Sequence, residues 1–376
     1  MAPLTVAFNL LFMGEQAGGI GRYSRELVRA MLAVEPDTRI VCLVGRDAPA
    51  DLREEPWADS VRFRRLPFAM ASRPPFHVAY QLAGLPGALR GVDVLHSPAN
   101  IGPLRCGVPA VMTLHDLVWI HHPAEWEDER TAARMRRVAV RCAHRADRVI
   151  AISRAAGEDL VETIGLDRTR VDVVPLGASP GPGAPPTPEP ELRARLGLGE
   201  RPLVLCISQK RPYKNQEALV RALPELHDAA LVCPGAATPY EARLRAVAEE
   251  LGVSDRVHLP EWVSEADLEG LYRAASCFAL PTLFEGFGLP VVEAMARGVP
   301  VACSDVWSLP ELAGDACLLF DPRDQAAVTG AVRRLLSDRA LTERLGAAGR
   351  ERAREFTWER TARGTLESYR RAITRS

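Results

Sequence analysis

Short apolar runs flanked by turn residues recur along the chain and alternate with segments of helical periodicity. The runs VAFNLLF (6–12), RIVCLVG (39–45) and AVMTLHD (110–116) have the length and residue types of buried strands. Further runs of this kind are DVLHSP, RVIAIS, VDVVP, PLVLCIS, AALVCPG, RVHLP, SCFALP, VPVACSD and ACLLFD. Because strands that alternate with helices form parallel βαβ units, the pattern predicts an α/β fold with doubly wound sheets.

A proline-rich segment divides this alternation into two halves. Residues 175–190, PLGASPGPGAPPTPEP, hold seven prolines and few side chains that could pack, which is typical of a linker. The expected organisation is an N-terminal domain (1–177), a linker (178–190), a C-terminal domain (191–355) and a final helix (356–376) that packs back towards the first domain. Ligands bind beyond the carboxyl ends of parallel strands, so we expect the site in the cleft between the domains.

The composition is that of a globular protein, with 47% apolar and 25% charged residues and a formal net charge of −1 over 376 residues. This balance gives no bulk attraction to nucleic acid. No apolar run reaches the roughly 18 residues of a membrane-spanning helix, and the first residues lack the basic region of a signal peptide. The eight cysteines are scattered without a C-x-x-C pair, so we expect buried, reduced thiols in a cytoplasmic protein.

The segment 281–300, PTLFEGFGLPVVEAMARGVP, predicts a glycine-broken loop that runs into a short helix. Gly286 and Gly288 allow backbone conformations that other residues resist, and they leave no side chain between the main chain and a ligand. Pro290 suits the first turn of the helix. The amide N–H groups at the helix start would point into open space and form an anion site; they belong to Phe287, Gly288 and Leu289.

Two glutamates frame this anion site. Glu293 lies about one turn into the helix, where its carboxylate can accept two hydrogen bonds from a vicinal diol such as a ribose. Glu285 precedes the helix and would meet the group on the far side of the phosphates. Together they suggest a sugar–diphosphate–ribose ligand, and the alternative is an ordinary strand–loop–helix connection with surface acids.

Three cations lie within five residues of the segment SQKRPYKNQEALVRAL (208–223), namely Lys210, Arg211 and Lys214. At the ligand-facing end of a strand, such cations could neutralise a diphosphate and stabilise its departure. The alternative is a solvated basic turn.

Two features of the N-terminal half are compatible with the same ligand. Gly18, Gly19 and Gly21 form a turn before an amphipathic helix whose N-terminus could face a phosphate, and a purely structural turn is the alternative. His115 ends a predicted strand, where a neutral imidazole could hydrogen-bond a sugar hydroxyl or a phosphate oxygen; a packing or capping role is the alternative. The chain has no D-x-D pair, so we expect no metal and no other cofactor.

Six arginines share one predicted helical stripe opposite an apolar face. They are Arg130, Arg134, Arg137, Arg141, Arg145 and Arg148. A basic amphipathic helix can lie on anionic lipid or hold an acidic acceptor, and it can also be a solvated face paired with the acids of residues 125–129. The sequence leaves peripheral contact with a membrane open.

In this order, the motifs resemble those of retaining glycosyltransferases of the GT-B fold, family 4, over nearly the whole chain. The matching segments are GGIGRY, DVLHSP, TLHDL, ADRVIAIS, VVPLG, KRPYKN, FEGFGLPVVEAMARGVPV and FTWERTA. The most specific is the E-x7-E pattern of Glu285 and Glu293. The resemblance implies two Rossmann-like domains and metal-independent transfer of a sugar, with retention, from a UDP- or GDP-sugar to a hydroxyl acceptor.

Carried over residue by residue, the resemblance implies that Glu293 binds the ribose of the nucleotide sugar. Glu285 would contact hydroxyls of the transferred sugar. Lys214, together with Lys210 or Arg211, would hold the diphosphate, and Lys214 would matter most because charge develops there in the transition state.

The remaining donor contacts implied by the resemblance come from the backbone at Gly19 and from the loop of Gly286, Phe287, Gly288 and Leu289. His115 would sit at the donor sugar. The catalytic residues would then be Lys214, Glu285 and His115. The leaving diphosphate itself would take the acceptor's proton, on the face from which it departs.

The sequence leaves the acceptor and the base of the donor open. Ser208 and Glu261 stand where glycine is frequent in the family, which puts the choice between uridine and guanosine in doubt. The N-terminal half, including the helix after Gly21 and the stretch 67–86, should bind the acceptor, which could be a small natural product, a glycan or a lipid-linked sugar. Alternative functions are a sugar-nucleotide-binding module without turnover and a sugar-nucleotide epimerase on the same fold.

Overall fold

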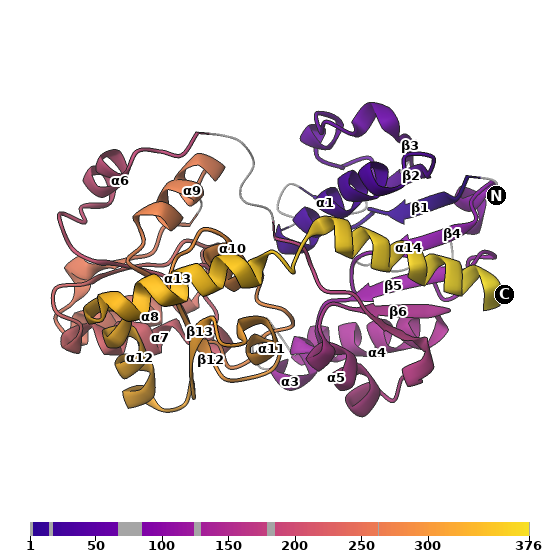
Figure 1. Ribbon diagram of the computed structural model, residues 1–376. Helices are drawn as coiled ribbons and strands as arrows, with labels where there is room; N and C mark the ends of the chain where they lie inside the picture. The colour runs from indigo at the N-terminus through magenta and orange to yellow at the C-terminus, as the bar shows by residue number, and fades with distance from the viewer. Residues whose placement is uncertain are drawn as a thin grey trace. The chain divides into compact units, whose positions relative to one another are not determined.

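The computed structural model describes residues 3–14, 18–66, 85–123, 129–178, 185–261 and 263–375. The chain divides into two compact units, each built on its own sheet (Figure 1). Unit 1 comprises residues 1–177 and 358–376, and unit 2 comprises residues 178–357. Helices and strands alternate within both units, which confirms the α/β prediction.

Unit 1 contains a seven-stranded parallel sheet with the order β3-β2-β1-β4-β5-β6-β7. The strands are β1 (Thr5–Asn9), β2 (Arg39–Val44), β3 (Arg62–Arg65), β4 (Val94–Ser97), β5 (Ala110–Leu114), β6 (Arg148–Ala151) and β7 (Val171–Val173). The apolar pattern predicts all of them except β3, whose sequence RFRR has no apolar run. β3 forms an edge of the sheet, where charged side chains are common because they discourage further pairing.

The helices of unit 1 connect these strands. The α-helices are α1 (Gly18–Val34), α3 (Val118–His121), α4 (Glu129–Arg145), α5 (Arg154–Ile164) and α14 (Trp358–Arg375), and the 3-10 helices are η1 (Ala50–Arg53), η2 (Ala58–Ser60), η3 (Pro86–Leu89) and η5 (Arg168–Arg170). Local sequence sets the bounds of α5. The Ser153 hydroxyl accepts the amide of Ala156 at its start, and Gly165 ends it with φ of 67°.

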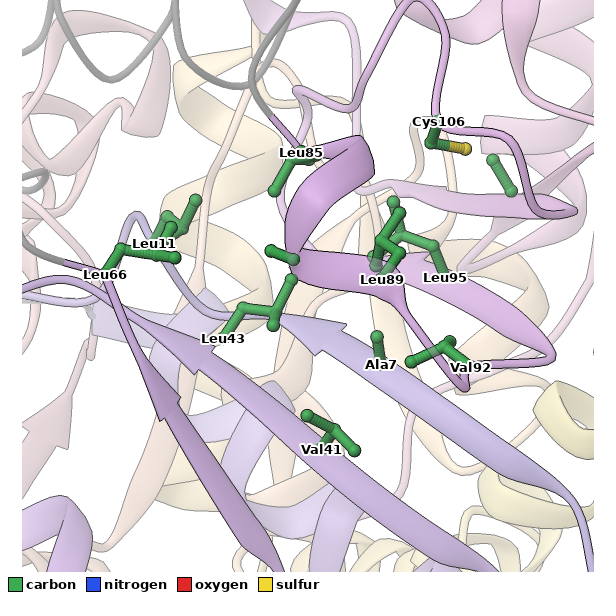
Figure 2. Packing of buried hydrophobic residues seen from close by; sticks show 12 residues of the cluster. Ala7, Leu11, Val41, Leu43, Leu66, Leu85, Leu89, Val92, Leu95 and Cys106 are labelled. Atoms are coloured by element: carbon green, nitrogen blue, oxygen red, sulfur yellow. The ribbon is translucent and has the colours of Figure 1, made fainter.

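The two faces of the first sheet are covered by different elements. Figure 2 shows an apolar cluster on one face, with side chains from β1, β2 and β4 against η3 and its flanking turn: Ala7, Val41, Leu43, Leu85, Leu89 and Leu95. Successive side chains of a strand point to opposite faces, so Phe8 and His96 lie on the other side. There the hydroxyl of Tyr369, from α14, is 2.7 Å from Nδ1 of His96.

The C-terminal helix α14 is part of unit 1 and lies beside α1 (Figure 1). Asp172 of β7 receives hydrogen bonds from Ser368 at 2.7 Å and Arg371 at 2.9 Å, both on α14. Arg148 of β6 binds the same carboxylate at 2.5 and 2.6 Å. Burial raises the pKa of Asp172, but the bonds from Arg148 and Ser368 outweigh it and hold the pKa below its usual value. This cluster fastens the final helix to the sheet.

Unit 2 contains a six-stranded parallel sheet with the order β10-β9-β8-β11-β12-β13. The strands are β8 (Leu203–Leu205), β9 (Ala230–Val232), β10 (Val257–His258), β11 (Cys277–Leu280), β12 (Val301–Ser304) and β13 (Cys317–Phe320). Each coincides with an apolar run of the sequence. All eight cysteines of the chain are buried free thiols, which confirms the prediction made from their scattered positions.

The first helix of unit 2 begins within the expected linker, and the others lie between the strands or after the last of them. The helices are α6 (Glu189–Leu196), α7 (Gln216–Ala222), α8 (Tyr240–Glu250), α9 (Glu265–Ala274), α10 (Leu289–Ala296), α11 (Leu309–Ala313), α12 (Gln325–Ser337) and α13 (Arg339–Ala353), with 3-10 helices η6 (Pro212–Lys214), η7 (Leu223–Glu225) and η8 (Ser254–Arg256). α6 starts inside the expected linker, because Pro190 falls in its first turn, where a missing N–H costs no hydrogen bond.

Candidate functional site

Unit 2 has a topological switch point between β8 and β11. The chain leaves β8 towards β9 on one side of the sheet, and later returns to pair β11 on the other side of β8. The loops at the carboxyl ends of two such strands part in opposite directions and leave room for a ligand. The basic loop follows β8 and the Glu285 loop follows β11, so the fold brings the two predicted motifs to the same place.

Lys214 and Glu285 form an ion pair across this switch point. The Nζ atom of Lys214 is 2.7 Å from Oε2 of Glu285, and the side chains are 13% and 16% exposed. The backbone holds the two loops in this register, since the carbonyl oxygen of Tyr213 accepts the amide of Leu283 at 2.7 Å and the hydroxyl of Thr282 at 3.2 Å. A cation and an acid therefore share one partly exposed position. When a ligand binds, Lys214 can contact an anion and Glu285 can accept a hydrogen bond from a hydroxyl, in place of their contact with each other.

Lys210 lies elsewhere, although it comes from the same loop. Its side chain is fully buried, and its Nζ atom donates to the carbonyl oxygens of Gly235 at 2.6 Å and Pro260 at 3.1 Å. Glu241 lies 3.3 Å from the same nitrogen. The ammonium thus joins the loops after β8, β9 and β10, and this arrangement does not present it to a diphosphate. Arg211, which is half-buried, donates to Gln209 of its own loop at 3.2 Å.

The residues of the glycine loop before α10 are largely buried, whereas their sequence predicts amides that face open space. Gly286, Phe287 and Gly288 are buried, and Leu289 is half-buried. Gly288 has φ of 100°, but Gly286 does not adopt a positive φ. A Cβ atom on Gly288 would lie 2.5 Å from the side chain of Leu309. Close packing of Leu309, the first residue of α11, therefore makes glycine necessary at position 288.

Glu293 is placed by α10 and oriented by a tyrosine. It is 3% exposed, and its Oε2 accepts a hydrogen bond from the hydroxyl of Tyr272 at 2.9 Å. Tyr272 belongs to α9 and is fully buried. Arg297, one turn further along the helix, donates to the carbonyl oxygen of Glu293 at 3.0 Å. The hydroxyl of Tyr272 therefore orients the carboxylate, while Arg297 bonds the backbone of the same residue. No local signal in the sequence points to Tyr272, which is 21 residues away.

Gln216 is a second residue that sequence reasoning does not identify. Its side chain is fully buried at the start of α7, and its Nε2 atom donates to the hydroxyl of Ser208 and the carbonyl oxygen of Gln209, both at 2.8 Å. The carbonyl oxygen of Ser208 lies 2.2 Å from where a Cβ of Gly235 would stand. Ser208 and Gly235 therefore fit closely against each other, and Gln216 fixes the start of the basic loop.

The predicted residues of unit 1 lie at a comparable edge of the first sheet. His115 directly follows β5 and is buried, and its ring contacts Tyr23 of α1 edge-on with centroids 5.0 Å apart. Its Nε2 is 2.8 Å from the carbonyl oxygen of Pro98, so this nitrogen is the donor and Nδ1 carries no proton in the neutral ring. Gly19 is the second residue of α1, one turn before Tyr23, and a Cβ there would meet no atom within 4 Å.

Burial keeps the histidines of this edge neutral. It lowers the pKa of His115 to about 4, although the bond to the carbonyl of Pro98 raises it. Burial and the neighbouring His115 lower the pKa of His96 to about 3. His96 also lies 2.9 Å from the hydroxyl of Thr113, which is 3.0 Å from that of Tyr23. His96, Thr113 and Tyr23 therefore form an uncharged hydrogen-bond network, and His115 bonds separately to Pro98.

The arginine stripe is shorter than predicted. The side chains of Arg130, Arg134, Arg137, Arg141 and Arg145 are exposed on α4, but the helix ends at Arg145. Arg148 lies in β6, and its side chain is buried against Asp172. The acids of residues 125–128 and the acceptor stretch 67–84 lie outside the described residues. Where the structure describes the chain, no three His, Cys, Asp or Glu side chains gather as they would to hold a metal ion.

Two family models match the chain. The model described as Glycosyltransferase Family 4 matches residues 17–180, and the model described as Glycosyl transferases group 1 matches residues 188–352. Within the parts that the structure describes, no helix is both long and apolar enough to cross a membrane.

Individual proteins resemble the chain over most of its length. D-inositol 3-phosphate glycosyltransferase of Salinispora arenicola is 33% identical over 309 residues, which are 75% of this chain and 69% of that protein. O-antigen chain mannosyltransferase B of Escherichia coli is 28% identical over 379 residues, 94% of this chain and 96% of that protein. The crystal structure of Anabaena HepE in complex with UDP and glucose covers 97% of this chain and 98% of its own, with 20% identity and a TM-score of 0.77.

Proposed function

The chain belongs to the group 1, family 4 glycosyltransferases, with a GT-B fold, and from this premise we propose that it transfers a sugar from a nucleoside diphosphate sugar to a hydroxyl acceptor. The proposal includes retention of anomeric configuration and independence from metal ions. The observation that carries it is the Lys214–Glu285 ion pair, held at the switch point of the sheet beside the helix that bears Glu293.

In this proposal the ligand replaces the ion pair. The ammonium of Lys214 binds the diphosphate, and the carboxylate of Glu285, 2.7 Å away, accepts a hydroxyl hydrogen of the transferred sugar. Diphosphate and sugar are adjacent in a nucleotide sugar, so one ligand can satisfy both groups. Glu293, oriented by Tyr272, accepts the ribose hydroxyls. Arg211 and the amides of Phe287, Gly288 and Leu289 supply further donors to the diphosphate. HepE, which has the same fold, binds UDP and glucose.

The reaction would proceed on one face of the sugar. The bond between the anomeric carbon and the diphosphate oxygen breaks, the bond to the acceptor oxygen forms, and the acceptor's proton passes to the leaving diphosphate. Negative charge grows on the diphosphate as this happens, and the positive charge of Lys214 offsets it. His115 and Gly19 belong to unit 1. A contact of His115 with the donor sugar, and of the Gly19 backbone with the diphosphate, stay predictions.

A transfer assay tests the proposal. The protein is incubated with UDP-glucose or GDP-mannose and with D-inositol 3-phosphate, an acceptor suggested by the name of one relative. Nucleoside diphosphate release is measured with and without a chelator, and the anomeric configuration is read by NMR. We expect an α-linked product from an α-linked donor, at a rate that the chelator does not change. A β-linked product would contradict retention, and donor binding without any release would favour the non-catalytic binding module.

The acceptor is assigned to unit 1, and its class is open. The exposed arginines of α4 would suit an acidic acceptor or an anionic membrane surface. Co-sedimentation with vesicles of phosphatidylcholine alone and of phosphatidylcholine with phosphatidylglycerol distinguishes these cases. Binding to the anionic vesicles that is lost when Arg134, Arg137 and Arg141 become glutamine would support membrane contact, and no binding to either vesicle would exclude it.

A further inference from the structure

The loop between β12 and α11 is locked onto the Glu285 loop. Ser308 is fully buried, and its hydroxyl lies 2.9 Å from the carbonyl oxygen of Glu285 and 2.8 Å from that of Phe287. The neighbouring Leu309 packs against Gly288, as described above. These contacts fix the residues before α11 relative to the carboxylate of Glu285. Any side chain that this loop exposes is therefore held at a defined place beside the proposed sugar position.

Trp307 is the residue that precedes Ser308, and its indole is 36% exposed. Its ring meets the ring of Phe284 at an angle of 66°, with centroids 4.5 Å apart. Phe284 is buried and directly precedes Glu285. The indole is thus held by the residue next to the catalytic glutamate of the proposal, while part of its surface remains open.

The backbone of Trp307 lies in the left-handed region, with φ of 53°. Bulky side chains rarely adopt this conformation, and glycine or asparagine would adopt it more easily. A tryptophan at this position therefore costs backbone strain, which a contact with Phe284 alone would not require.

We propose that Trp307 is a stacking platform for a pyranose ring next to Glu285. One face of a pyranose presents C–H groups, which pack well on an aromatic face, while its hydroxyls remain available to polar groups. The indole of Trp307 would pack against the C–H face of such a ring, and the carboxylate of Glu285 would accept hydrogen bonds from its hydroxyls. The inference rests on the proposed function, and it adds a specificity-determining contact that is separate from the binding of the nucleotide.

The pyranose could be the transferred sugar of the donor or a sugar of the acceptor, and two variants test both sources. Trp307→Asn removes the ring but suits the left-handed backbone, and Trp307→Phe keeps an aromatic face. Leu319→Ala is the matched control, because Leu319 is 38% exposed on β13 of the same unit. Dissociation constants of UDP, GDP, UDP-glucose and GDP-mannose are measured for each protein, together with KM for D-inositol 3-phosphate and for a glycosylated acceptor.

For a donor platform, we expect Trp307→Asn to bind the nucleotide sugar about 3- to 10-fold more weakly and the free nucleotide unchanged. For an acceptor platform, we expect Trp307→Asn to raise KM for the glycosylated acceptor by the same factor. Trp307→Phe should retain most of the affinity, and Leu319→Ala all of it. The inference is overturned if Trp307→Asn changes neither quantity in an enzyme whose wild type transfers sugar, or if the free nucleotide loses as much affinity as the nucleotide sugar. A wild type that neither binds nor transfers any donor would instead contradict the proposed function.

Discussion

The carboxyl edges of the two sheets carry different kinds of polar side chain. In unit 1, His96, Thr113 and Tyr23 form a buried network of uncharged groups beside His115, and burial lowers the pKa of both histidines. In unit 2, Lys214 and Glu285 are charged, paired and partly exposed. Both edges follow parallel strands in doubly wound sheets, so topology alone does not account for the contrast.

The contrast separates the network of His96, Thr113 and Tyr23, which holds the fold, from the ion pair of unit 2, which can meet a charged ligand. A neutral buried network satisfies its own hydrogen bonds and offers little to a diphosphate. The side chains of Lys214 and Glu285 remain 13% and 16% exposed, so a ligand can reach both groups and replace their mutual contact. The same distinction holds within unit 2 between Lys210 and Lys214, which are the two lysines of the chain.

Replacing Lys214 should have the largest effect on activity. With Lys214→Ala, nothing offsets the charge that grows on the leaving diphosphate, and we expect kcat to fall by about 10²- to 10³-fold. Steady-state kinetics with a saturating donor measure this. Arg221→Ala, which removes a cation from the helix that follows, is the control and should leave kcat unchanged. A Lys214→Ala enzyme with normal kcat would show that the ion pair is merely structural.

Replacing Lys210 should instead affect stability. Lys210→Met removes the Lys210 donor from the carbonyl oxygen of Gly235 and one of two donors from that of Pro260, and it leaves Glu241 without a buried cation. We expect the free energy of unfolding in urea to fall by about 2–4 kcal/mol. The paired variant Lys214→Met should lose less, because the side chains of Lys214 and Glu285 keep some contact with water whereas that of Lys210 is fully buried. A Lys210→Met protein that is stable but binds nucleotides weakly would contradict the structural role of Lys210. Lys210 would then bind the diphosphate, as the sequence predicts.

Acidification should weaken unit 1 through its histidines. The unfolded chain takes up protons near the ordinary histidine pKa of about 6.5, whereas the native state resists protonation until about pH 4 at His115 and about pH 3 at His96. The free energy of unfolding should therefore fall as pH decreases from about 6.5, by at most about 1.4 kcal/mol per pH unit for each histidine. Urea titrations between pH 7.5 and 5 measure the slope. His96→Gln should reduce it, and an equal slope in that variant would contradict the assignment.

A change at Glu293 should have a smaller effect, confined to nucleotide binding. Glu293→Gln keeps an acceptor for Tyr272 but loses the charge that strengthens hydrogen bonds from a ribose. We expect about a 10-fold weaker dissociation constant for the cognate nucleoside diphosphate, which corresponds to about 1.4 kcal/mol. Thermal-shift titrations with UDP, GDP and ADP measure it. Tyr272→Phe should weaken binding less, because it removes only the group that orients the carboxylate. Unchanged binding by both variants would mean that the ribose lies elsewhere.

The sequence predicts the strands and the loop motifs well, because both depend on local pattern. Apolar runs identify every strand except β3, whose charged side chains suit an edge. Lys214 and Glu285 are identified from their own loops and meet because β8 and β11 are neighbours. The different positions of Lys210 and Lys214 could not be predicted. Four residues apart in one loop, they differ only through contacts with distant carbonyl groups.

The remaining site residues depend on contacts between segments far apart in the chain. Tyr272 reaches Glu293 from the preceding helix, and Trp307 reaches Phe284 from the loop after β12. Arg148 continues the arginine spacing of α4 in the sequence, but the helix ends before it and Asp172 pairs with it. Periodicity carries no information about such partners, because they are set by packing between elements.

The reactivity of Lys214 towards reductive methylation tests the central claim most directly. The chain has two lysines, and Lys210 is fully buried, so mass spectrometry can follow the modification of Lys214 alone. The rate is measured with UDP, GDP or ADP and with the matching nucleoside. If the charged edge of unit 2 binds a nucleoside diphosphate, one of the three nucleotides will protect Lys214 and its nucleoside will not. Equal modification of Lys214 under all these conditions would contradict the account.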